Sequence, residues 1–71
     1  MKYDYSKLTG LIVEKFRTRY KFAYAMNMKH SSISLKLNNQ VGFSQEEIIK
    51  AMELLQIPPC ELDQYFFKQK I

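Results

Sequence analysis

The side chains that most often carry chemistry are few and far apart in this sequence. The chain has one histidine, His30, and one cysteine, Cys60. Catalysis needs several titratable groups that converge, and a structural zinc site needs a full set of His and Cys ligands. No glycine-rich phosphate loop and no HExxH motif occurs. The sequence therefore predicts no catalytic residue, no metal and no cofactor, and a role other than that of an enzyme.

Charged side chains are distributed unevenly along the chain. Lysine and arginine number 11 against 7 aspartates and glutamates, which gives a formal net charge of +4. Four cations and no acid fall between Lys15 and Lys21, whereas five of the acids fall between Gln45 and Asp63. Modest basicity favours anionic partners, including nucleic acid, so the first half of the chain is where such a partner is expected.

Composition predicts one folded domain, 1–71, in the cytoplasm. A hydrophobic fraction of 46% in 71 residues argues against disorder. The single thiol of Cys60 fits a reducing compartment. The apolar stretches are far shorter than the roughly 20 residues of a membrane span, and the first residues lack the apolar core of a signal peptide. We therefore expect a soluble protein with no membrane partner and no small-molecule substrate.

Apolar residues at helical spacing predict an all-α fold of five helices. The first is expected at about 5–17, with Asp4 or Ser6 as its cap. The second is expected at 19–26, after Thr18 as N-cap, and ends at Asn27, a residue that tolerates left-handed backbone. The inward residues of these helices are Leu8, Leu11, Ile12, Phe16, Phe22, Ala23 and Met26.

Three further helices complete the predicted outline. The third is expected at 30–37, and the fourth at 44–56, where Ser44 and Glu47 have the spacing of a capping box. Pro58 ends the fourth helix and precedes a short fifth at 59–67. The tail, 68–71, is expected to be loose. The inward residues of these helices are Ile33, Leu37, Ile48, Ile49, Met52, Leu55, Leu62, Tyr65 and Phe66.

Residues 18–39 resemble the helix-turn-helix motif of the Cro and immunity-repressor class of temperate phages and bacteria. The whole chain is similar to the Cro-like and modulator-of-repression proteins of temperate phages of low-GC Gram-positive bacteria. Arg17, Asn27 and Asn39 stand where the family usually has turn glycines. The resemblance implies a five-helix, lambda-repressor-like domain in the host cytoplasm. The residues that carry it are Thr18, Phe22, Ala23, Met26, Asn27, Ile33, Leu37, Asn38 and Asn39.

In this family the second helix of the motif enters the major groove of DNA. The resemblance therefore implies two sets of DNA-binding or partner-binding residues. The candidates for base edges are Lys29, His30, Ser31, Ser34 and Leu35. The candidates for phosphates are Arg19, Ser32, Lys36, Asn38 and Gln40.

Each assignment has an ordinary structural alternative. Lys29 and His30 can be solvated residues at a helix start, and 31–32 can supply only the N-cap. Leu35 can belong to the core or to an interface, and Lys36 can be an exposed lysine without a ligand.

Three consecutive aromatic residues near the C-terminus have two interpretations. A helix can turn only part of the run Tyr65, Phe66 and Phe67 inward, so an exposed remainder can form a protein interface, including that of a homodimer. The alternative is that the rings fold back on the first helix and complete a small core.

The sequence is consistent with two functions. The first is a Cro-like or antirepressor transcription regulator of the lysis–lysogeny switch, bound to a double-stranded DNA operator. The second is an interaction protein that binds the phage immunity repressor and has little DNA binding of its own. The third helix favours the second function in one respect, because it lacks Arg, Gln and Asn, the side chains best suited to bidentate base contacts.

Overall fold

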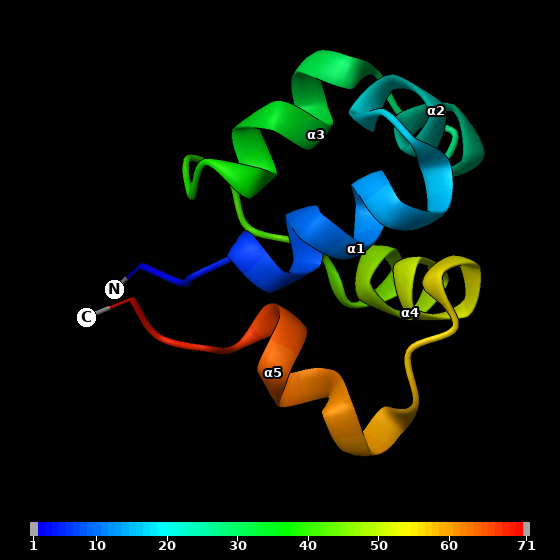
Figure 1. Cartoon of the computed structure of the whole chain (residues 1–71). Coiled ribbons are helices and arrows are strands. Elements are labelled where there is room, and N and C mark those ends of the chain that lie inside the picture. The colour runs from blue at the N-terminus through cyan, green and yellow to red at the C-terminus, as the bar shows by residue number, and fades with distance from the viewer. Residues whose placement is uncertain (1, 71) are drawn as a thin grey trace.

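The computed structural model of the chain describes residues 2–70 and confirms the all-α class (Figure 1). Four helices agree with the expected ranges to within one residue at each end. The expected fifth helix is divided into a 3-10 turn of three residues and an α-helix of five residues. The elements are α1 Ser6–Phe16, α2 Arg19–Ala25, α3 His30–Leu37, α4 Gln45–Leu55, η1 Pro59–Glu61 and α5 Leu62–Phe66.

Helix α1 lies at the centre of the molecule, with α2 and α3 on one side and α4 and α5 on the other (Figure 1). Leu8 and Ile12 of α1 are fully buried, as their spacing predicts. Ile49 of α4 is an exception to the expected inward face, since half of its surface is exposed. The buried hydrophobic residues are Tyr5, Leu8, Ile12, Phe22, Ala23, Met26, Ile33, Leu37, Ala51, Leu55, Ile57 and Phe66.

The ends of the helices follow the sequence signals with some differences. Thr18 caps α2 by accepting from the Lys21 N–H at 3.1 Å. Asp4 accepts from the N–H of Ser6, although the N-cap position of α1 belongs to Tyr5. The N-cap of α3 is Lys29 without a side-chain bond, so the alternative of a serine cap at 31–32 is wrong.

Left-handed backbone occurs at the turns although no glycine stands there. Asn27 has φ 60° in the turn between α2 and α3, as expected. Arg17 and Asn39 have φ 75° and 64°, so all three positions at which the resemblance implied turn glycines have positive φ. Positive φ costs about 1–2 kcal/mol for a residue with a Cβ, less for asparagine.

The two ends of the chain pair with each other. Asp4 N–H donates to the Lys68 carbonyl at 2.7 Å, and Lys70 N–H donates to the Lys2 carbonyl at 3.0 Å. The expectation of a loose tail is therefore wrong for 68–70, while residue 71 lies outside the described residues. Backbone pairing of distant segments leaves no local hydrophobic pattern from which it could be predicted.

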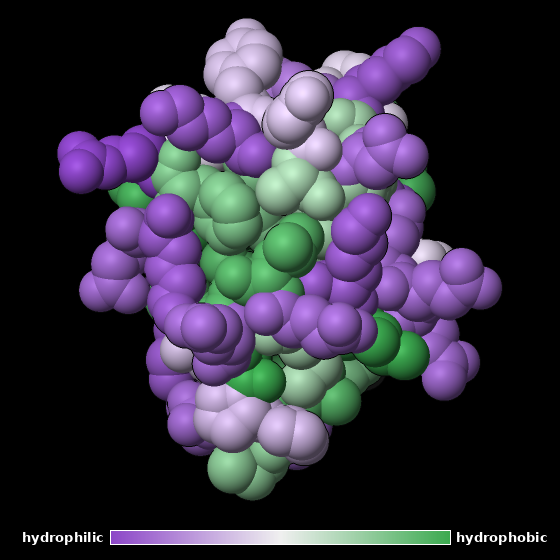
Figure 2. Space-filling view, turned by 90° about the vertical axis from the view of Figure 1, so that its right-hand side faces the viewer, coloured by the Kyte–Doolittle hydropathy of each residue, from purple (hydrophilic) through white to green (hydrophobic). Residues whose placement is uncertain are grey.

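One side of the molecule, over α2 and α4, is shown in Figure 2. An apolar area at its centre is framed by hydrophilic side chains. The chain termini lie on the opposite side (Figure 1). Among the helices within 2–70, none has the length and apolar character needed to cross a membrane.

Candidate functional site

Helices α2 and α3 form the expected helix-turn-helix, joined by the turn at 26–29. The ten candidate residues differ in exposure because only part of α3 faces outward. Lys29, Ser31, Leu35, Asn38 and Gln40 are exposed. Arg19, His30, Ser32 and Ser34 are half-buried, and Lys36 is buried.

Lys36 is engaged inside the protein. Its side chain leaves α3 towards α4, where the ammonium lies 3.0 Å from a Glu47 carboxylate oxygen and donates to the Gly42 carbonyl at 2.9 Å. The ammonium also lies over the Phe43 ring, 5.9 Å from its centroid. Only 8% of the residue is exposed. The sequence-based expectation of a phosphate contact at Lys36 is therefore corrected, because this charge already has its partners.

Glu47 serves the start of α4 and the ion pair at once. Its carboxylate accepts from the Ser44 N–H at 2.8 Å, while its own N–H donates to the Ser44 hydroxyl at 3.1 Å, which is the expected capping box. Burial by itself raises the pKa of Glu47, but the hydrogen bonds from Ser44 and Lys36 and the Lys36 charge outweigh it and lower the pKa. The carboxylate therefore stays ionised and holds α3 against α4.

A small hollow opens beside this ion pair on the outer side of α3. Its volume is about 170 Å³. Leu35 of α3 and Val41 of the following loop flank it and are 41% and 47% exposed. We call it the α3 notch, and its lining residues are Met28, Ser32, Leu35, Lys36, Val41 and Glu47. Sequence reasoning included Leu35 and Ser32 but missed Val41, because the path of the loop after α3 is set by tertiary contacts.

Two tyrosines of α2 form a second outward feature that sequence reasoning missed. The Tyr20 ring stacks on the His30 ring at 3.8 Å with an interplanar angle of 9°. This contact joins the first turn of α2 to the first residue of α3 and positions the His30 ring. Tyr24, one turn further along α2, is 89% exposed. The available signal was the i, i+4 spacing of Tyr20 and Tyr24 on the side opposite to the buried Phe22.

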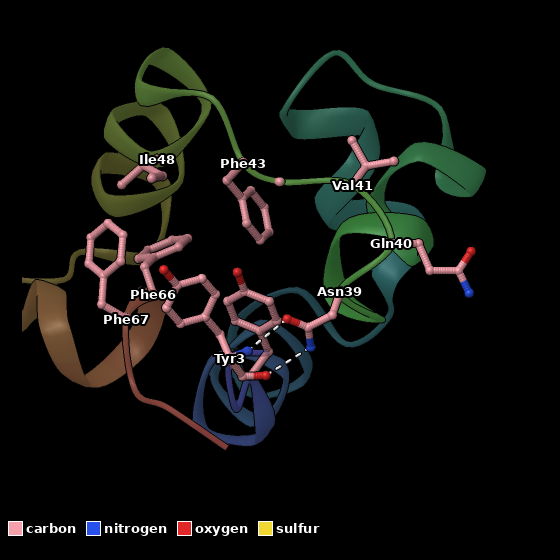
Figure 3. Close-up of a pocket in the computed structure, with 10 residues that line it drawn as sticks. Tyr3, Asn39, Gln40, Val41, Phe43, Ile48, Phe66 and Phe67 are labelled. Carbon is pink, nitrogen blue, oxygen red and sulfur yellow. Dashed lines mark hydrogen bonds between the residues drawn. The ribbon is translucent and has the colours of Figure 1, made fainter. Parts of the chain in front are cut away.

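Aromatic rings surround a larger hollow on another side of the molecule (Figure 3). Its volume is about 310 Å³. The Phe43 ring meets the Tyr5 and Phe66 rings edge to face, at 5.5 and 5.4 Å between centroids. Figure 3 shows Gln40 pointing away from this hollow. These edge-to-face contacts make the hollow chiefly a part of the packing that joins α1, α4 and α5.

The C-terminal aromatic run is divided between core and surface. Phe66 is buried, so the prediction that it belongs to a protein interface is wrong, and the alternative that it completes the core holds for this ring. Tyr65 is half-buried beneath Lys7, whose ammonium lies 4.9 Å from the ring centroid. Phe67 remains 44% exposed and contacts the Tyr3 ring at 5.9 Å.

Residues 1–69 match a protein family described as "Protein of unknown function (DUF739)". The chain belongs to this family. Comparison with curated proteins gave no match.

The chain is also similar to a solved structure over its whole length. The chain is similar to the solution structure of the modulator of repression (MOR) of the temperate bacteriophage TP901-1 from Lactococcus lactis. The two are 45% identical with a TM-score of 0.83, and the match covers 100% of this chain and 96% of the other. The resemblance to modulator-of-repression proteins is thereby confirmed. The relative is a regulatory phage protein and not an enzyme, in agreement with the non-enzymatic role expected here.

Proposed function

We propose that this protein regulates the lysis–lysogeny switch of a temperate phage by binding the phage immunity repressor through the outward side of α3. It acts in the bacterial cytoplasm, where it changes the binding of that repressor to DNA. The observation that carries the proposal is the α3 notch, with exposed Leu35 and Val41 beside a Lys36 charge that is already paired.

The chemistry of α3 supports a protein partner over a phosphate backbone. Burial of Lys36 leaves Lys29, at the N-cap, as the exposed cation that belongs to α3 and its caps. The helix HSSISLKL contains no Arg, Gln or Asn for bidentate base contacts. Exposed apolar side chains at the rim of a hollow supply the desolvated contacts that concentrate binding energy in protein interfaces. The similar phage protein is named a modulator of repression, which is consistent with a repressor as partner.

Calorimetric titration with the immunity repressor of the same phage tests the proposal. Leu35→Ser removes an apolar side chain from the rim of the notch while leaving the buried face of α3 intact. We expect a loss of affinity of about tenfold or more, since truncation of a central interface residue costs about 2 kcal/mol.

Ile49→Ser is the matched control. Ile49 is 50% exposed, comparable to Leu35, and lies about 200° round α4 from Glu47 at 100° per residue. We expect this variant to bind the repressor like the wild type. Equal affinity of Leu35→Ser and the wild type would contradict the placement of the interface, and absence of any complex would contradict the proposed function.

Operator binding of the Cro type is a second candidate function. The helix-turn-helix itself favours it, together with Arg19 at the start of α2 and exposed Lys29 at the start of α3. A helix N-terminus attracts phosphate, and Arg19 adds a charge there. Gel shifts on the intergenic phage DNA without repressor test this function. If Arg19→Ala and Lys29→Ala bind such DNA as tightly as the wild type does, α3 is not its reading helix.

A further inference from the structure

The paired chain ends form a short two-stranded ribbon, which we call the terminal ribbon (2–4 and 68–70). Tyr3 and Gln69 face each other as an antiparallel bridge. The backbone bonds Asp4 N–H to Lys68 carbonyl and Lys70 N–H to Lys2 carbonyl lie on either side of this pair. Tyr3 and Gln69 are therefore a non-hydrogen-bonded pair, and the backbone polar groups of Tyr3 point away from the other strand.

Asn39 binds those outward groups of Tyr3. Its side-chain oxygen accepts from the Tyr3 N–H at 2.8 Å, and its side-chain nitrogen donates to the Tyr3 carbonyl at 2.8 Å (Figure 3). The amide thus takes the place of a neighbouring strand. Since Asn39 directly follows the C-cap of α3, the ribbon is fixed next to the end of that helix.

Successive side chains of the ribbon point to opposite faces, which places the aromatic ring of Tyr3 on one face and the charged side chains on the other. In an antiparallel pair, residues directly opposite each other share a face, and successive residues alternate. Tyr3 faces the protein, where its ring meets those of Tyr5 and Phe67 at 6.1 and 5.9 Å. The other face therefore carries Lys2, Asp4, Lys68 and Lys70.

This outer face is basic. All three lysines are exposed, and the described residues supply no carboxylate within ion-pair distance of them. The Asp4 carboxylate is occupied by hydrogen bonds from Ser6, which lower its pKa, with a smaller contribution from the charges of Lys68 and Lys70. Over the described residues 2–4 and 68–70, this face therefore carries three positive charges and one negative charge, a net charge of +2 that attracts an external anion.

We propose that the terminal ribbon binds the phosphate backbone of duplex DNA, separately from the α3 notch. Lys68 and Lys70 are two residues apart on one strand, a spacing of about 6.6–6.8 Å. Each strand of duplex DNA presents one phosphate for about every 3.4 Å of helix axis, so two long and flexible lysine side chains at this spacing can contact phosphates of one duplex at once. The ribbon face has no apolar side chain to insert into a lipid surface, which favours DNA over a membrane. This inference goes beyond the proposed function, because the protein then contacts DNA while its notch holds the repressor.

Fluorescence anisotropy of a labelled 20-base-pair duplex of arbitrary sequence, titrated over a range of salt concentrations, tests the ribbon. The variant is Lys68→Gln/Lys70→Gln, which removes two charges, keeps polar side chains at both positions and leaves every backbone bond in place. We expect weaker binding at low salt. The slope of log affinity against log salt is expected to fall in magnitude by about 1–2, since each phosphate that a lysine neutralises adds about 0.9 to that slope.

The control is Lys15→Gln/Lys50→Gln, which removes the same charge elsewhere. These lysines donate to Gln56 and to the Met26 carbonyl, at the ends of α4 and α2, on the side opposite the chain termini (Figure 1). The slope is expected to keep its wild-type value. An equal loss of DNA affinity and of slope in both double variants would show that only the net charge of the protein matters, and it would overturn the proposal. Undetectable DNA binding by the wild type would also overturn it.

Repressor titration separates this proposal from the preceding one. The ribbon variant is expected to bind the repressor with wild-type affinity, whereas Leu35→Ser is expected to bind arbitrary duplex DNA normally. Loss of repressor affinity in Lys68→Gln/Lys70→Gln, with unchanged DNA binding, identifies the ribbon as a protein-binding surface and overturns the assignment to DNA. Vesicles of anionic phospholipid serve as a third probe, and tighter binding to them than to DNA also overturns it.

Discussion

Replacing Glu47 by Gln removes the charge of the α3–α4 ion pair and leaves the rest of the helix start in place. Glutamine at this position still completes a capping box with Ser44. The Lys36 ammonium loses its carboxylate at 3.0 Å and keeps the Gly42 carbonyl at 2.9 Å. The variant therefore measures how strongly the pair holds α3 against α4, and with it the shape of the α3 notch.

The size of the effect follows from the exposure of the two side chains, 10% for Lys36 and 26% for Glu47. Fully exposed ion pairs contribute about 0.2–1 kcal/mol, and hydrogen bonds to charged groups contribute about 1.5–3 kcal/mol. This partly screened pair lies between them, so we expect the free energy of unfolding to fall by about 1–2 kcal/mol. Urea denaturation at neutral pH measures it.

Glu46→Gln is the matched control, because Glu46 is an exposed neighbour in the same first helical turn. It loses the same charge near the N-terminus of α4, which is worth about 0.3–1 kcal/mol through the helix dipole. The difference between the two variants isolates the ion pair.

The pH dependence of the free energy of unfolding tests independently whether ionised Glu47 stabilises the fold. The pKa of Glu47 in the folded protein lies below its usual value of 4.5, so ionisation favours the folded state. Its stabilisation is complete above the unfolded pKa and disappears as the pH falls through the folded pKa. Wild type and Glu47→Gln are therefore expected to differ at pH 7 and to converge in acid. Equal stability of Glu47→Gln and Glu46→Gln at pH 7, or a gap that widens in acid, would refute the reasoning.

Three further predictions concern single side chains. Asn39→Ala is expected to lower the free energy of unfolding by about 2–3 kcal/mol, because two hydrogen bonds are lost and alanine is strained at positive φ. Asn39→Gly is expected to lower it by less, because glycine adopts positive φ without strain. Equal urea midpoints for the two variants would show that backbone strain does not contribute. Phe66→Ala is expected to lower the free energy of unfolding by about 3–5 kcal/mol, whereas Phe67→Ser is expected to leave it nearly unchanged. Sedimentation of Phe67→Ser and the wild type shows whether the exposed Phe67 ring drives self-association. Tyr20→Ala is expected to free the His30 ring, which NMR detects as loss of the ring-current shift on the histidine protons, and an unchanged spectrum contradicts the stacking.

Local signals in the sequence determined the helices and their ends. Apolar residues at helical spacing predicted α1 to α4 to within a residue, because such stripes must be buried whatever the partner. Thr18, Asn27 and the pair Ser44 and Glu47 act within a few residues of themselves, so their roles could be predicted before any packing was known. The phage relationship also followed from residues in the helix-turn-helix.

Tertiary structure alone decided what the candidate site can touch. Lys36 has the sequence context of an exposed helix residue, and only the approach of α4 places Glu47 beside it. Phe66 and Phe67 are adjacent and chemically equal, and the direction of α5 buries one and exposes the other. The terminal ribbon joins segments more than sixty residues apart in the chain. In each case the deciding interaction is non-local, and no short stretch of sequence encodes it.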